Sequence, residues 1–199
     1  AMLEIDSLQL IEPTHLHYFA RFKAHESPLG KLVRLFLLRD CVSGLELRDI
    51  FTEPLLNQLE RHGVIAPSNG GWVARIDLFE VDGLYFATDH RYALYDKDRI
   101  DEDPVMYIGQ DSLGLAMTAP RYKTEKVLDL CCGSGIQGLI QSRYTIQVTG
   151  VDINPRAIRF SRFNAQLNGI RNAKFIEADL YAAVESQLFD TIVANPPFV

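Results

Sequence analysis

The feature that most constrains the fold is a short apolar strand that runs into a glycine-containing turn and a helix, over residues 127–138. Glycines in such a turn let a cofactor approach the backbone closely. A second apolar strand is expected at Ile146–Val151, and it ends in Asp152. An acid at this place commonly accepts hydrogen bonds from ribose hydroxyls. The pair of strands therefore predicts a site for an adenosine-bearing ligand.

Two further strands are expected along the chain. Ala173–Ala178 ends before Asp179, and Asp190–Ala194 ends before Asn195. Open parallel sheets bind ligands at the carboxyl edge of their strands, so the four strands bring four functional groups to one edge. The predicted fold class is α/β, a doubly wound Rossmann-like sheet preceded by a small α+β domain.

The fourth strand runs into the tetrapeptide Asn195-Pro196-Pro197-Phe198. Prolines restrict the backbone, so the side-chain carbonyl of Asn195 and the main-chain carbonyl of Pro196 can both accept from one NH2 group. Phe198 offers an apolar face for a flat substrate group. This segment predicts a pocket that positions an amide or amino nitrogen for alkylation.

With these motifs, the chain from Tyr107 onward resembles the class I S-adenosylmethionine-dependent methyltransferases. It resembles most the small-domain group that includes release-factor glutamine methyltransferases and enzymes that methylate amino groups of nucleic-acid bases. The first motif of the family is usually acid-Leu-Gly-Cys-Gly-Thr-Gly, and here it is Asp129-Leu-Cys-Cys-Gly-Ser-Gly135. Cys131 replaces the first glycine, and it is a small residue too.

The resemblance implies S-adenosyl-L-methionine as the cofactor and a macromolecular methyl acceptor, either a protein glutamine or a base of RNA or DNA. The residues that it implies for cofactor binding are Asp129, Cys131, Gly133, Gly135, Asp152, Ile153, Asp179 and Ser112. Among them, Asp152 serves the ribose, Ile153 packs on the adenine and Asp179 accepts from the adenine amino group. Asn195, Pro196 and Phe198 hold the acceptor.

The chemistry requires positioning more than a strong base. A nitrogen whose lone pair is delocalised becomes a better nucleophile when both its N–H groups are bound by acceptors. The five histidines, His15, His17, His25, His62 and His90, lie outside these motifs. We therefore expect a transfer without a metal ion.

Other interpretations of the same residues remain open. The glycines can form an ordinary tight turn, and Asp152 or Asp179 can cap the next helix, a role compatible with ligand binding. One rival class is a dinucleotide-dependent oxidoreductase, which shares the glycine turn and the acid but does not explain the Asn-Pro-Pro-Phe segment. The second rival is a non-catalytic winged-helix regulator that senses the cofactor.

The N-terminal half differs in charge from the rest. Residues 1–104 hold 11 Lys and Arg against 18 Asp and Glu, whereas residues 105–199 hold 9 against 8. The charged run Tyr95–Pro104 predicts a boundary between an accessory or substrate-recognition domain, 1–104, and a partial methyltransferase domain, 105–199. An acidic half is a poor candidate for direct DNA reading.

Local patterns in that half predict helices at Leu32–Leu38 and Glu53–Arg61 and a hairpin over Val73–Thr88 that turns at Asp82-Gly83. Helices followed by a hairpin are typical of a winged-helix module. A further helix is expected to open within Gly109–Leu115, with Asp111 or Ser112 as its cap.

The composition of the chain indicates its cellular compartment. The three cysteines have no evident pairing, and no stretch is long and apolar enough to span a membrane. We therefore expect a cytoplasmic protein.

Only four of the seven strands of the resembled fold fit before Val199. We expect a fragment of a longer enzyme that transfers methyl groups inefficiently by itself and associates with itself through the exposed edge of its fourth strand.

Overall fold

The computed structural model of the chain describes residues 3–4, 15–24, 26–90 and 104–197. The chain divides into two compact units, Ala1–Leu78 and Phe79–Val199, which are described separately. In the described residues, no helix has the length and apolar character needed to cross a membrane.

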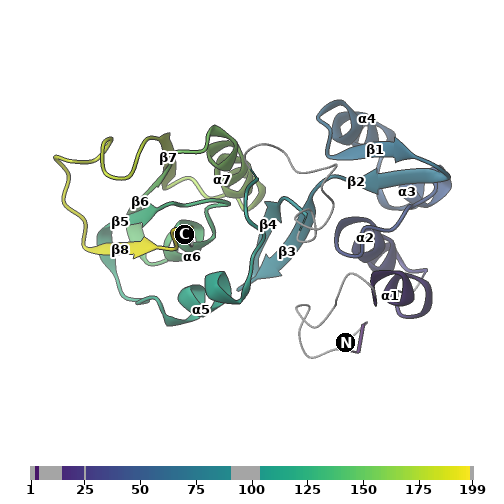
Figure 1. The fold of residues 1–199 in the computed structure, drawn as a ribbon, viewed down its shortest axis with the longest axis horizontal. Coiled ribbons are helices and arrows are strands. Elements are labelled where there is room, and N and C mark those ends of the chain that lie inside the picture. The colour runs from purple at the N-terminus through teal and green to yellow at the C-terminus, as the bar shows by residue number, and fades with distance from the viewer. Residues whose placement is uncertain (1–2, 5–14, 25, 91–103, 198–199) are drawn as a thin grey trace. The chain divides into compact units, whose positions relative to one another are not determined.

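The described residues of the first unit form four helices and one antiparallel hairpin, which are drawn in Figure 1. Its elements are α1 (Leu16–Phe22), α2 (Pro28–Phe36), α3 (Gly44–Ile50), α4 (Glu53–Arg61), β1 (Ile65–Ser68) and β2 (Gly71–Ala74). Apolar side chains of α2, of α3, of the hairpin and of the connection between the two helices form its core: Leu35, Phe36, Val42, Leu47, Ile65 and Ala74.

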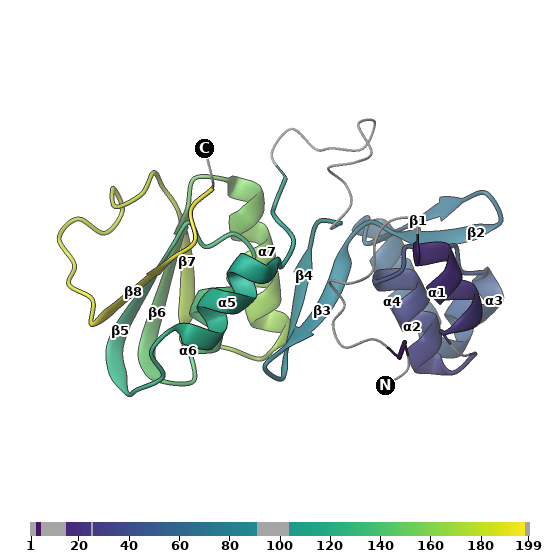
Figure 2. The same ribbon diagram turned by 60° about the horizontal axis from the view of Figure 1, so that its bottom comes forward.

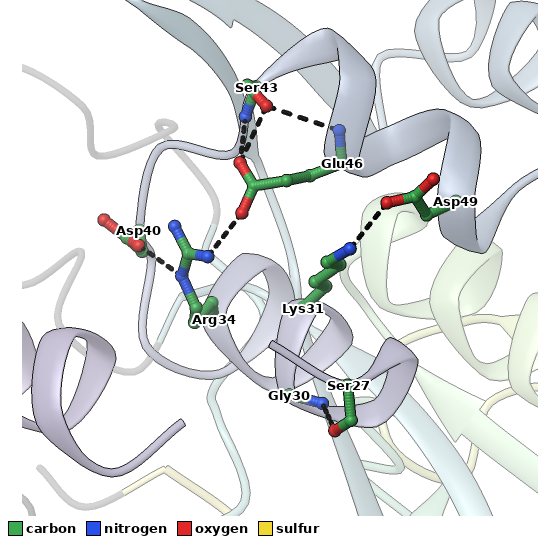
Figure 3. Close-up of polar contacts among 8 residues, drawn as sticks. All are labelled: Ser27, Gly30, Lys31, Arg34, Asp40, Ser43, Glu46 and Asp49. Atoms are coloured by element: carbon green, nitrogen blue, oxygen red, sulfur yellow. Dashed lines mark hydrogen bonds and ion pairs between the residues drawn. The ribbon is translucent and has the colours of Figure 1, made fainter. Parts of the chain in front are cut away.

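Polar contacts hold α2 against α3 (Figure 3). The Arg34 guanidinium donates to Asp40 at 2.7 Å and to Glu46 at 2.5 Å. Glu46 also accepts from the backbone N–H of Ser43, whose hydroxyl caps the start of α3. This capping box satisfies N–H groups that the first helical turn leaves unpaired. Arg34 of α2 and Ser43 at the start of α3 thus bind the same carboxylate, that of Glu46.

Several local expectations for this half agree with the structure. Helix α4 has the predicted bounds, whereas α2 begins at Pro28, earlier than expected, because Ser27 caps it. The hairpin expected over Val73–Thr88 consists of β3 (Asp77–Val81) and β4 (Leu84–Thr88), which are joined at Asp82-Gly83.

Other expectations stay predictions or need correction. The hairpin of β1 and β2 was not expected, and Val73 belongs to it and not to β3. The winged-helix assignment is not confirmed. Residues 95–103 of the charged run that predicts a domain boundary lie outside the described residues, so that boundary stays a prediction.

The second unit is built on a four-stranded parallel sheet with the order β7-β6-β5-β8 (Figure 1). Its strands are β5 (Thr124–Leu130), β6 (Thr145–Asp152), β7 (Ala173–Glu177) and β8 (Thr191–Ala194), and its helices are α5 (Gln110–Thr118), α6 (Ile136–Gln141) and α7 (Pro155–Leu167). The three helices lie on one side of the sheet (Figure 2). The segment between β7 and β8 covers the other side, where Val184 packs on Leu128 and Val151. This confirms the predicted α/β, Rossmann-like fold with a parallel sheet.

The register of the strands brings their ends together. Leu130 of β5 is paired with Val151 of β6 and with Ala194 of β8. The next residue on each strand therefore lies at one carboxyl edge: Cys131, Asp152 and Asn195. This is the edge where parallel sheets bind ligands.

Two asparagine side chains bind backbone N–H and C=O groups of β4, as a neighbouring strand would, and so hold it against α7. Asn168 donates to Tyr85 O at 2.7 Å and accepts from Tyr85 N–H at 2.8 Å. Asn164 does the same with Ala87, at 3.0 and 2.8 Å. Asn164 lies in α7 and Asn168 is its C-cap, so the two side chains are one helical turn apart, which matches the spacing of alternate residues on the strand.

Candidate active site

The glycine turn after β5 has a backbone that favours glycine at three places. Cys131, Gly133 and Gly135 have φ of 57°, 53° and 80°. A Cβ on Gly135 would lie 2.9 Å from Ser161 Cβ, whereas a Cβ on Gly133 would meet nothing within 4 Å. Gly135 is therefore required for packing, and Gly133 leaves open space at the turn. Cys131 adopts left-handed backbone geometry, which explains why related motifs carry glycine there.

Asp152 ties this turn to the end of β6. Its Oδ2 accepts from Gly133 N–H at 2.8 Å, and its Oδ1 accepts from Asn154 N–H at 2.9 Å. The capping interpretation of Asp152 is wrong, because Asn154 is the N-cap of α7 and accepts from Arg156 and Ala157 N–H. Each carboxylate oxygen keeps a further lone pair for a ligand.

Asp129 is buried beneath the turn. Its Oδ2 accepts from Gly138 N–H at 2.8 Å, and its Oδ1 is a buried atom with no partner. Burial raises the pKa of this carboxyl to about 8; the Gly138 hydrogen bond opposes that rise, and the charge of Asp152 adds to it. An orphaned carboxyl oxygen of this kind is an unusual feature in a folded core, where buried polar atoms are almost always paired.

The pH dependence of stability follows from Asp129. Between about pH 4 and 8 Asp129 keeps its proton in the folded chain and has lost it in the unfolded chain. The free energy of unfolding therefore falls as pH rises through this window, by up to about 1.4 kcal/mol per pH unit. Asp129→Asn keeps an acceptor for Gly138 and removes the titration. Urea unfolding from pH 5 to 8 should show the wild type losing stability relative to this variant; parallel profiles would contradict the burial argument.

Asn195 is held by the first turn of α5. Its Nδ2 donates to Asp111 Oδ2 at 2.7 Å and to Ser112 Oγ at 3.2 Å. These contacts correct the expected capping role, since α5 begins at Gln110 with Gly109 as its N-cap. A Cβ on Gly109 would lie 2.5 Å from Asp111 Oδ1, so glycine makes room for the carboxylate. With Nδ2 bound to acceptors on α5, the Asn195 Oδ1 is left to accept from another group.

The sequence interpretation did not assign three residues that support the site. Gln137 donates to Ser112 O at 2.8 Å, which ties α5 to α6. Asn164 donates to Ser134 O at 2.9 Å as well as to β4, so one buried side chain joins the glycine turn to the hairpin. Asp111 was interpreted only as a cap. Gln137 and Asn164 are polar residues at buried positions of their helices, a signal that could have drawn attention to them.

The remaining predicted residues border this edge. Ile153 is 67% exposed, and Asp179 and Pro196 are exposed too. Ala178 N–H donates to Asp152 O at 3.0 Å, which brings the segment before Asp179 to the site. Phe198 lies outside the described residues. In the described residues, no group of three His, Cys, Asp or Glu is arranged to hold a metal ion.

The cysteines of the turn stay protonated at neutral pH. Burial, followed by the charges of Asp152, Asp129 and Asp179, raises the pKa of the Cys131 thiol. Burial also raises the pKa of the Cys132 thiol well above its ordinary value. Thiolates are the reactive form of cysteine, so the environment disfavours redox chemistry here.

Comparison with known proteins gives the same assignment to this part of the chain. The family model "Methyltransferase small domain" matches residues 108–199. An uncharacterized RNA methyltransferase of Protochlamydia amoebophila is 39% identical over 80 residues, which are 38% of this chain and 18% of that protein. A release factor glutamine methyltransferase of Thermodesulfovibrio yellowstonii is 34% identical over 76 residues, 37% of this chain and 27% of that protein.

A putative protein N5-glutamine methyltransferase of Methanocaldococcus jannaschii is 34% identical over 91 residues, 45% of this chain and 45% of that protein. The chain thus spans less than half of the length of each of these relatives. The family match and the carboxyl-edge geometry concern the same residues. Residues 108–199 of the chain thus match the methyltransferase small-domain family in sequence and carry the carboxyl-edge site described above.

Proposed function

We propose that this chain carries the cofactor site of an S-adenosyl-L-methionine-dependent methyltransferase that acts on an amide or exocyclic amino nitrogen of a macromolecule. The observation that carries the proposal is the placement of Asn195 next to Cys131, at the same carboxyl edge as Asp152, with its amide oriented by Asp111. The names of the relatives, which include RNA and protein-glutamine methyltransferases, support the same class of reaction.

The residues at the edge fit S-adenosyl-L-methionine. The unpartnered Asp129 Oδ1 and the open space at Gly133 are features that a bound ligand with polar groups would use. In this proposal Asp129, Cys131, Gly133 and Gly135 surround its methionine part, and Asp152 accepts from the ribose hydroxyls. Ile153 and Asp179 serve the adenine, and Ser112 lies over the cofactor. When bound, this cofactor supplies an electrophilic methyl group on a sulfonium.

Asn195 and Pro196 would orient the acceptor nitrogen. The Asn195 Nδ2 donates to Asp111, so its Oδ1 can accept one N–H of the substrate while the Pro196 carbonyl accepts the other. Binding both N–H groups shifts electron density towards the nitrogen. Methylation of an NH2 group releases one proton, and neither carbonyl can take it, so that proton leaves to water. Phe198 would offer the apolar face for the flat acceptor group.

Binding experiments with the two cofactor types distinguish this proposal from the oxidoreductase alternative. We expect S-adenosylhomocysteine to bind the chain with a micromolar dissociation constant in calorimetry, and NAD⁺ not to bind at the same concentration. The reverse preference would overturn the proposal. The family match favours an enzyme over a non-catalytic regulator. The recognition role of residues 1–104 and a cytoplasmic location stay proposals.

We also expect the chain to associate with itself through β8. This strand pairs with β5 on one edge, and within the described residues no strand pairs with its other edge, where Ile192 is 52% exposed. Unpaired strand edges offer N–H and C=O groups to another chain. Light scattering after size exclusion should give a mass above that of one chain, reduced by Ile192→Lys. A strictly monomeric wild type would contradict this expectation.

A further inference from the structure

One stretch of the second unit is positively charged throughout. Residues 155–176 hold five Lys and Arg and no Asp or Glu, in a chain whose net charge is −6. The stretch consists of α7, the connection after it and most of β7. Such a local excess of one charge sign in an acidic chain marks a surface with its own electrostatic role.

The exposed side of α7 carries two of these five charges. Arg159, Arg162, Phe163 and Gln166 follow the spacing of one helical face, and all four are exposed. The opposite side is buried and includes Ile158, Ser161 and Asn164. Phe163 is 44% exposed among the arginines, so an aromatic ring is available beside positive charge.

The same surface continues onto the edge strand of the sheet. Arg162 donates to Phe175 O of β7 at 2.8 Å, so its guanidinium lies on that strand. Arg171, in the connection, and Lys174, on β7, are exposed. Helix α7 lies alongside β7 in both ribbon views (Figures 1 and 2), and β7 ends the sheet. We call Arg159, Arg162, Phe163, Arg171 and Lys174 the α7–β7 surface.

Its cations are not neutralised by carboxylates. In the part of the chain that the structure describes, none of the four forms an ion pair. Elsewhere in the second unit arginines are paired: Arg121 and Arg143 with Asp82, and Arg156 with Asp89. Two further cations of this unit without a described ion pair, Lys123 and Lys126, lie apart in sequence at the start of β5, so the α7–β7 surface holds the larger group of unpaired cations.

We propose that the α7–β7 surface docks single-stranded nucleic acid. This inference rests on the proposed function and narrows its acceptor to a nucleic-acid base. Helix α7 begins three residues after Asp152, so a strand that follows the surface towards the start of α7 reaches the edge that holds Asp152 and Asn195. Cations neutralise phosphates without reading sequence, and an exposed ring stacks on a base.

The test uses the 199-residue chain and a fluorescent single-stranded RNA of about 20 nucleotides, with binding followed by anisotropy. The double variant Arg159→Glu with Arg171→Glu should weaken binding by at least about 10-fold at low salt. The slope of log affinity against log salt should become shallower by about 0.7 for each phosphate contact that is lost. Neither arginine donates a hydrogen bond that the fold requires, in contrast to Arg162.

Two control variants separate this surface from general charge. Arg143→Ala removes an arginine that is already paired with Asp82, and it should leave RNA affinity unchanged. Phe163→Ala should weaken RNA binding several-fold and leave binding of inorganic polyphosphate unchanged, because only RNA has bases to stack.

Three results would overturn the inference. The first is that the wild type does not bind RNA, and the second is that the wild type and the double variant bind it equally. The third is that polyglutamate competes as strongly as RNA at equal charge, which would indicate an acidic protein partner. Calorimetry with S-adenosylhomocysteine on the same variants reports on the fold and the cofactor site. Intact cofactor binding with any of these three results rejects the docking surface and leaves the proposed function standing.

Discussion

Replacement of Asn195 by alanine should lower turnover of the full-length enzyme by about two orders of magnitude. The side-chain carbonyl is expected to accept an N–H of the acceptor, and preorganised hydrogen-bond partners at the reacting group contribute on that scale. Cofactor affinity should stay near normal, because the described side-chain hydrogen bonds of Asn195 run to Asp111 and Ser112 of α5. Steady-state kinetics and calorimetry on the same preparation measure both quantities.

A reciprocal exchange serves as the control for this prediction. Asn195→Asp alone places two carboxylates against each other, whereas the addition of Asp111→Asn restores a donor–acceptor pair in the reverse sense. The double variant should therefore be more active than Asn195→Asp. An alanine variant with the parental rate would remove Asn195 from the acceptor site.

Replacement of Asp152 by alanine should weaken binding of S-adenosylhomocysteine by roughly 1–3 kcal/mol, about 5- to 150-fold in the dissociation constant. Two causes act together. The variant loses charge-assisted hydrogen bonds to the ribose, and it releases Gly133 N–H from the carboxylate that holds the glycine turn. Calorimetry gives the change directly.

Asp190 provides a matched control at the opposite edge of the sheet. Its carboxylate also accepts from two backbone N–H groups, those of Glu125 and Lys126, at 2.9 and 2.8 Å. Asp190→Ala should therefore cost stability without changing cofactor affinity. Equal losses of affinity in both variants would mean that the effect of Asp152 comes only from the fold.

The parallel sheet was predictable because each strand contains apolar residues and is followed or ended by a residue of a recognisable site motif. Strands β6 and β8 lie within a residue of their expected bounds, and the register brings Cys131, Asp152 and Asn195 to one edge as expected. In these segments local pattern and tertiary burial favour the same structure, so the sequence was sufficient.

The supporting contacts were not predictable, because they join residues far apart along the chain. Asp111 contacts Asn195 across 84 positions, and Asn164 contacts Ala87 across 77. Local rules assign Asp111 to a helix cap, and only the tertiary fold, which brings the first turn of α5 to the residue after β8, places it against Asn195. Likewise, the hairpin of β1 and β2 turns at Asn69-Gly70, a favoured turn pair, but Pro67 in β1 weakens the strand pattern.

The most direct test of the proposed function compares RNA, DNA and protein by mass spectrometry from a strain that lacks the full-length gene. We predict that one methyl group disappears from an amide or exocyclic amino nitrogen, that the intact gene restores it, and that the Asn195→Ala gene does not. Methylation that is unchanged in all three classes of macromolecule, or a lost methyl group that sits on carbon or oxygen, would contradict the assignment of Asn195 to an NH2 acceptor.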